Sequence, residues 1–152
     1  MGTKKSLLTD GGGGPLGVVI AGANAVEQKL LRATIDAVVV DRPEPDDVEQ
    51  HLCLDAGYDN PSGREAVEAN GYIGHISPAR PGRRGKRRPG RRKARRWVVE
   101  RTFGWLSKCR GILVRYEKKD ANYLGLIKFA CGLYWYRRLH RIGGTDANRE
   151  IT

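Results

Sequence analysis

"KKSLLTDGGGGPLGVVIAG", residues 4–22, contains two apolar runs separated by an aspartate and four consecutive glycines. Short runs rich in Leu, Val and Ile that are bounded by glycine are typical of strands. Glycine adopts the positive φ angles that tight hairpin turns require. We therefore expect strands over residues 4–9 and 17–22, joined by a turn over 10–15. A phosphate-binding loop is the other role of such a glycine run, but no Lys-Ser or Lys-Thr follows it.

The residues after this hairpin predict a helix. Asn24 can cap it, with Glu27 three residues further on, and an apolar stripe at helical spacing follows. The stripe consists of Leu30, Leu31, Thr34, Ile35 and Val38. An acidic, proline-bearing connection over residues 41–50 then separates this helix from the next element.

A strand–helix–strand unit is expected next. Residues 51–59 begin as an apolar strand, and residues 71–77 read as a second strand. Between them, Asn60 stands at a helix cap position and Pro61 at the first helical position, where its missing N–H costs nothing. There are no internal repeats.

Two amphipathic helices are expected in the remainder of the chain. The first spans residues 95–110, is broken by Gly111, and is followed by a short apolar link over 111–118. The second spans residues 121–141, and residues 142–152 form a flexible tail. The predicted core residues are Val99, Phe103, Leu106 and Cys109 in the first helix, and Tyr123, Leu124, Ile127, Cys131, Tyr134 and Leu139 in the second.

The excess positive charge lies in one segment. The chain has 28 Lys and Arg against 17 Asp and Glu, a net charge of +11. Residues 80–96 hold eleven of the basic residues and no acid, which leaves 17 basic groups for the 17 acids elsewhere. Such a block stays solvated and extended, and its commonest partner is nucleic acid. A basic loop without a partner is the alternative.

The cysteines and the apolar runs of the sequence indicate the cellular compartment of the protein. Cys53, Cys109 and Cys131 are odd in number, far apart and in apolar surroundings, so we expect buried free thiols in a reducing compartment. No run approaches the roughly 18 apolar residues of a membrane span, and the amino terminus lacks the apolar core of a secretion signal. We expect a cytoplasmic protein of one domain with no membrane partner.

Two acids are candidates for chemistry. Asp55 ends the apolar strand "HLCLD" and precedes Gly57, and functional groups gather at the carboxyl ends of strands in α/β sheets. A capping or surface acid is an equally good interpretation of Asp55, while Asp59 fits the turn before Pro61. Glu100 follows Arg96 by one helical turn, so an ion pair competes with a role in binding a metal beside a phosphate.

Four stretches, taken in order and spacing, resemble the DDE transposases of bacterial insertion sequences. The resemblance covers about residues 2–140. It implies an α/β, RNase H-like mixed sheet flanked by helices, and an enzyme of DNA transposition and recombination. The stretches are "GTKKSLLTDGGGGPLGVVIAGAN", "LCLDAGYDN", "RRWVVERTFGWLSKCRGILVRYEKK" and "LIKFACGLYWYRRL".

The resemblance assigns roles to particular residues. Asp55 matches the second catalytic acid of the family and Glu100 the third, and both would bind Mg²⁺ or Mn²⁺. Arg96 matches the Arg of the family's R-x-x-x-E signature, whereas Lys108 falls one residue past the spacing of a later family lysine. The basic loop over 80–96 would contact transposon ends and target DNA through Arg83, Arg84, Lys86, Arg87, Arg88, Arg91, Arg92, Lys93, Arg95 and Arg96.

The chain also departs from the family pattern. The first catalytic Asp would precede the "GTK" block, where Met1 stands, and Asp10 does not replace it because it lies in the following turn. Val26 and Glu27 stand where relatives commonly have a His-Asp pair. We therefore expect residues 1–141 to form part of a catalytic domain that lacks its first strand and has little activity alone.

Three functions are consistent with these features. The first is a transposase fragment that cleaves and joins DNA strands once an upstream transposase half or a partner chain completes it, with homo-oligomers possible. The second is a non-catalytic DNA-binding remnant that inhibits a full-length transposase. The third, a basic adaptor for RNA or ribosomes, leaves the Asp55 and Glu100 matches as coincidence.

Overall fold

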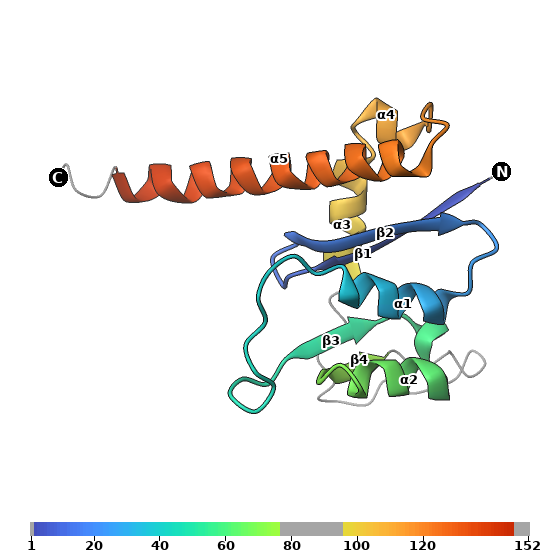
Figure 1. The fold of residues 1–152 in the computed structure, drawn as a ribbon. Helices are drawn as coiled ribbons and strands as arrows, with labels where there is room; N and C mark the ends of the chain where they lie inside the picture. The colour runs from blue at the N-terminus through green and yellow to red at the C-terminus, as the bar shows by residue number, and fades with distance from the viewer. Residues whose placement is uncertain (1, 77–95, 148–152) are drawn as a thin grey trace, which may run out of the picture.

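The computed structural model describes residues 2–76 and 96–147, which form a mixed α/β fold (Figure 1). In chain order the elements alternate as the sequence predicts: two strands, a helix, a strand, a helix, a strand and then helices. Their bounds are β1 Thr3–Thr9, β2 Pro15–Gly22, α1 Glu27–Asp36, β3 His51–Leu54, a 3₁₀ turn Ala56–Tyr58, α2 Pro61–Glu68, β4 Ile73–Ile76, α3 Arg96–Leu106, α4 Arg110–Leu113 and α5 Asp120–Ala147.

The predicted hairpin is confirmed and lies at the centre of the fold. β1 and β2 pair antiparallel, with Leu7 opposite Val18. In Figure 1 the hairpin lies between α1 on one side and α5 on the other. Its alternating side chains serve two cores, because Leu7 packs with residues of α3, α4 and α5 while Leu8 packs with residues of α1, α2 and β3. The hairpin therefore joins the two halves of the molecule.

Helix α1 buries its predicted stripe but begins differently from the prediction. Leu30, Leu31, Thr34 and Ile35 are all buried. Asn24 does not cap the helix, because the cap position is Val26 and it makes no side-chain capping bond. Thr34 keeps its hydroxyl satisfied by donating to the Leu30 carbonyl at 2.6 Å.

β3, α2 and β4 form a parallel strand pair with α2 as its crossover helix. Leu52 lies opposite Gly74 in the parallel register. The predicted cap is confirmed: Asn60 Oδ1 accepts from the Gly63 N–H at 2.9 Å, and Pro61 begins the helix. Val67 of α2 is only 1% exposed and packs in the same core cluster as Leu8 and Leu52.

The sequence led us to expect one mixed sheet, whereas the described residues form two separate two-stranded sheets. One is antiparallel, β1–β2, and the other is parallel, β3–β4. No strand of residues 2–76 and 96–147 joins the two pairs. They still share a core, since Leu8 of β1 and Leu52 of β3 belong to one cluster of buried residues.

The carboxyl-terminal helices differ from the prediction in their limits. α3 ends at Leu106 rather than residue 110, and Gly111 lies inside the short helix α4 instead of breaking a longer one. α5 runs to Ala147, so the first residues of the expected tail are helical, and residues 148–152 lie outside the described part. The Tyr123 hydroxyl donates to the Ile112 carbonyl at 2.7 Å, which ties α5 to α4.

Some core predictions are also corrected. In α3 the buried residues are Val98, Thr102 and Leu106, because Thr102 packs against the hairpin turn; Val99 and Phe103 are only partly buried. Leu139 is 63% exposed, and it belongs to the carboxyl-terminal half of α5, which extends beyond the hairpin (Figure 1). Cys53 is exposed because strand alternation turns Leu52 to the core and Cys53 outward. All three cysteines are free thiols.

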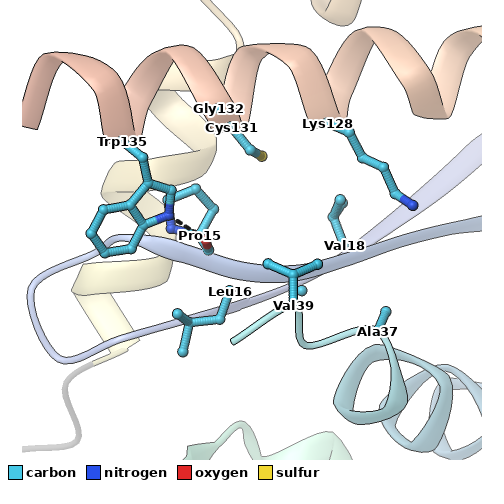
Figure 2. Close-up of a pocket in the computed structure, with 10 residues that line it drawn as sticks. Pro15, Leu16, Val18, Ala37, Val39, Lys128, Cys131, Gly132 and Trp135 are labelled. Carbon is cyan, nitrogen blue, oxygen red and sulfur yellow. Dashed lines mark hydrogen bonds between the residues drawn. The ribbon is translucent and has the colours of Figure 1, made fainter. Parts of the chain in front are cut away.

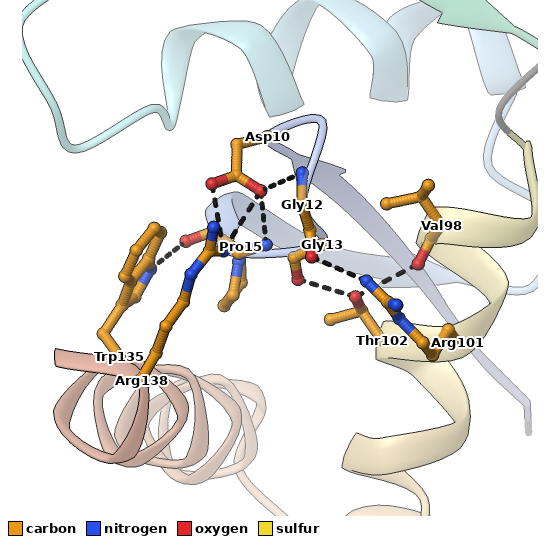
Figure 3. A network of polar contacts seen from close by, with 10 residues as sticks. Asp10, Gly12, Gly13, Pro15, Val98, Arg101, Thr102, Trp135 and Arg138 are labelled. Atoms are coloured by element: carbon orange, nitrogen blue, oxygen red, sulfur yellow. Dashed lines mark hydrogen bonds and ion pairs between the residues drawn. The ribbon is translucent and has the colours of Figure 1, made fainter. Parts of the chain in front are cut away.

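The hairpin turn is held by two helices (Figure 3). From α3, Arg101 Nη2 donates to the Gly12 carbonyl at 2.6 Å and Thr102 Oγ1 donates to the Gly13 carbonyl at 2.7 Å. From α5, Trp135 Nε1 donates to the Pro15 carbonyl at 2.7 Å, and Arg138 pairs with Asp10 at 3.1 Å. The turn thereby fixes both helices to the sheet.

Two glycines of this turn are required for different reasons. Gly13 has φ of 90°, a conformation that side chains rarely adopt. A Cβ at Gly14 would lie 2.3 Å from Trp135 Cζ2, so the indole occupies the space. Asp10 completes the turn by accepting from the Gly12 and Gly14 N–H groups at 2.8 and 2.6 Å.

Gly17→Ala should destabilise the fold, because a Cβ there would lie 2.7 Å from the Thr34 carbonyl oxygen of α1 and 3.1 Å from Ala37 backbone atoms. Backbone cannot yield as a flexible side chain does, so we expect a loss of about 1 to 3 kcal/mol in the free energy of unfolding, measured by urea titration. Gly22→Ala on the same strand is the control, since nothing lies within 4 Å of its added Cβ. Equal effects of the two changes would contradict the proposed packing of α1 on β2.

Candidate functional site

Asp55 lies directly after β3, at the carboxyl end of the parallel strand pair. The residue is exposed, and its Oδ1 accepts from the Ala56 N–H at 2.7 Å, which makes it the cap of the 3₁₀ turn. The cap interpretation of Asp55 is therefore confirmed, while its catalytic role stays a prediction. The strand and the turn therefore fix the position of this acid.

Asp59 has the structural role that the sequence predicted. It ends the 3₁₀ turn and forms an ion pair with Arg64 of α2. Asn60, the next residue, caps α2 through Gly63. These contacts stabilise the segment that follows Asp55 and keep the turn closed.

Glu100 is exposed on α3. Its neighbours in the chain, Arg101 and Thr102, hold α3 against the hairpin turn through the Gly12 and Gly13 carbonyls. These two positioning residues were not found from the sequence, where Arg101 looks like one more surface cation. The only available signal was a threonine, Thr102, on the apolar side of the helix.

The other residues of the predicted site are placed less completely. The side chain of Arg96 is not described, so the structure tests neither the predicted ion pair with Glu100 nor a phosphate contact. Lys108 is exposed in the turn after α3, beyond the helix that carries Glu100. The remaining residues predicted to bind DNA, Arg83, Arg84, Lys86, Arg87, Arg88, Arg91, Arg92, Lys93 and Arg95, lie outside the described residues.

The acids of the described segments do not form a complete metal centre. Within residues 2–76 and 96–147, no group of three or more His, Cys, Asp or Glu side chains could hold a metal ion. Asp55 and Glu100 come from elements that are separate in the chain, the end of β3 and the middle of α3. Both offer carboxylate oxygens, the ligands that Mg²⁺ prefers.

A histidine pair lies across the β3–β4 sheet, with His51 at the start of β3 and His75 in β4, and both residues are exposed. His75 Nε2 and His51 Nδ1 are 3.0 Å apart in a hydrogen bond, and Glu49 lies 3.8 Å from His51 Nε2. Sequence reasoning missed this pair, because it depends on the parallel register that sets Cys53 opposite His75. The pair occupies two ring nitrogens with each other and stands outside the predicted chemistry.

One pocket among the described residues has neither Asp55 nor Glu100 in its lining. It has a volume of about 210 Å³ between α5, β2 and the segment after α1, and its lining is mostly apolar (Figure 2). Cys131 borders it, but burial raises the pKa of this thiol to about 11, so it is protonated and unreactive at neutral pH. With no carboxylate in its lining, the pocket is not a site for the chemistry of Asp55 and Glu100.

No helix in the described part of the chain is both long enough and apolar enough to cross a membrane.

Comparison with known proteins identifies the family. The family model described as a transposase DDE domain matches residues 1–135. The putative transposase for insertion sequence element IS402 of Burkholderia cepacia is 32% identical over 143 residues, which is 92% of this chain and 65% of that relative. No solved structure matches the chain. The chain belongs to the DDE transposase family of insertion sequences.

Proposed function

We propose that this chain is part of the catalytic domain of a transposase that cleaves and joins DNA strands with the help of divalent metal ions. The observation that carries this proposal is the placement of Asp55 and Glu100. Asp55 is fixed at the carboxyl end of a parallel strand, and Glu100 is on a helix that Arg101 and Thr102 hold against the central hairpin. These are the two acids that match the family pattern.

The strand pairs support an RNase H-like arrangement in which a further strand would complete one mixed sheet. β1 pairs with β2 and β3 pairs with β4 within the described residues, and Leu8 and Leu52 share a core between them. A strand placed between β1 and β3 would hydrogen bond to an edge of each pair. In the family pattern this strand carries the first catalytic acid, so its addition would bring a third carboxylate to the site.

The chemistry assigned to Asp55 and Glu100 is metal-assisted attack on a phosphodiester. Bound divalent ions would activate the attacking hydroxyl and stabilise the leaving oxygen. The task of the two side chains is to bind through carboxylate oxygens and to hold their position. The cap from Ala56 restricts Asp55, and the anchored helix α3 restricts Glu100.

The basic loop over residues 80–96 would supply the DNA contact. In the sequence it leads directly into α3, which begins at Arg96 and carries Glu100. Phosphates bound by this segment would lie near the acid assigned to cleavage. Lys and Arg in a glycine- and proline-bearing segment favour backbone contacts over the reading of bases, which is the task of groove-binding elements.

Asp55→Asn and Glu100→Gln should each weaken Mn²⁺ binding by about tenfold or more, because each removes a charged oxygen ligand from the site. Asparagine keeps an acceptor for the Ala56 N–H, so the change in Asp55 leaves the cap in place. Isothermal titration calorimetry on the full chain measures the affinity. Glu68→Gln, an exposed acid at the end of α2, is the control.

Unchanged Mn²⁺ affinity in both variants would refute the assigned metal site. It would favour the alternative function, a non-catalytic DNA-binding protein that inhibits a full-length transposase.

DNA binding should depend strongly on salt. If six to ten cations contact phosphates, affinity falls by roughly 10³ to 10⁵ between about 50 and 200 mM salt. Arg87→Ser with Arg88→Ser should lower the slope of log affinity against log salt by about two, measured by fluorescence anisotropy on a duplex. Lys118→Ser with Lys119→Ser removes the same charge from an exposed segment before α5 and should leave the slope unchanged. A slope that both pairs lower equally would contradict the role of the loop.

A further inference from the structure

Helix α5 carries an apolar stripe that the described part of the chain leaves largely uncovered. The buried side of the helix consists of Tyr123, Ile127 and Ala130, which pack on the hairpin and α4. A second row of apolar side chains lies on another, exposed side of the helix. Successive members of this row are three, four and three residues apart in the sequence. Its members are Leu126, Phe129, Leu133 and Tyr136, with exposed fractions of 37%, 71%, 37% and 65%.

The spacing of this stripe is that of a two-helix seam. Steps of three and four repeat every seven residues, which keeps a row of side chains facing one partner helix over several turns. α5 has 28 residues, or about 42 Å at 1.5 Å per residue, and its carboxyl-terminal half extends beyond the hairpin in Figure 1. A partner helix therefore has room to lie along it.

Two glycines beside the stripe support the same conclusion independently. Gly125 and Gly132 are seven residues apart in the interior of α5, where each costs about 1 kcal/mol of helix stability relative to alanine. Nothing in the described chain lies within 4 Å of a Cβ added at either position. Packing within the chain does not require them, whereas a second helix approaching closely would.

We propose that α5 pairs with α5 of a second copy of this chain in antiparallel orientation. With a two-fold axis at the level of Cys131, the stripe is complementary to itself. Leu126 lies opposite the partner's Tyr136, and Phe129 lies opposite the partner's Leu133, so each ring meets a leucine. A closed two-fold pair of this kind uses the same surface on both copies.

Charge favours the antiparallel orientation over the parallel one. Arg137, Arg138 and Arg141 lie near the carboxyl-terminal end of the helix, whereas Glu117 and Asp120 lie at its amino-terminal end together with Lys118 and Lys119. Parallel pairing would set the two arginine clusters side by side. Antiparallel pairing separates the two clusters and opposes the helix dipoles. Because a single helix pair is a small interface, we expect a dissociation constant in roughly the micromolar range.

The test is the mass of the full chain in solution. Light scattering on nuclease-treated protein in moderate salt should give a mass that rises from 16.9 kDa toward twice that value with concentration. Phe129→Glu should weaken association by about thirtyfold or more, because it sets an unpaired charge in the centre of the seam. Val48→Glu is the control, since Val48 is 51% exposed on the loop before β3. Circular dichroism checks that the helix content of each variant is unchanged.

A mixing experiment tests the orientation. Leu133→Lys should also give a monomer, yet mixing it with Phe129→Glu should restore dimers, because only antiparallel pairing sets residue 129 of one copy opposite residue 133 of the other. A wild-type chain that stays monomeric at about 200 μM, well above the expected dissociation constant, would overturn the proposal. So would a Phe129→Glu chain that associates as strongly as the wild type, or a mixture that shows no recovery.

Discussion

The fold depends on the hydrogen bonds and the ion pair that α3 and α5 make to the turn between β1 and β2. Asp10 closes the turn, Arg101 and Thr102 hold it from α3, and Trp135 and Arg138 hold it from α5. Residues about 90 and 130 positions apart in the chain meet there because the glycines leave their carbonyl groups accessible and leave space for an indole. The charged pair of Asp10 and Arg138 is partly buried, so it is screened less than a surface ion pair.

This constraint positions the helix that carries Glu100. An acid on an exposed helix face has no fixed place unless the helix itself is fixed, and here the residues directly after Glu100 make the fixing contacts. Asp55 is fixed in a different way, by strand β3, its cap to Ala56 and the closed turn before α2. Different local contacts therefore hold the two acids assigned to metal binding: the cap to Ala56 holds Asp55, and the anchored helix α3 holds Glu100.

The hairpin, the order of the elements, the cap of α2 and most of the α1 core could be predicted, because each follows from local patterns of glycine, caps and apolar spacing. The limits of α3 could not, since a short turn and α4 replace the continuous helix that its apolar residues indicate. Leu139 and Cys53 look like core residues by composition, but which side of an element is buried depends on tertiary packing. The separation into two strand pairs also depends on long-range pairing, which residue patterns do not encode.

If Asp55 and Glu100 bind one metal ion, iron-mediated cleavage of the polypeptide should cut the chain beside both residues. Fe²⁺ replaces Mg²⁺ at oxygen sites, and with ascorbate and peroxide it produces radicals that cut backbone close to the bound ion. We expect cuts near both residue 55 and residue 100, suppressed by excess Mg²⁺ and lost together in Asp55→Asn. Cuts at only one of the two segments, or cuts that persist in Asp55→Asn, would contradict a shared metal site.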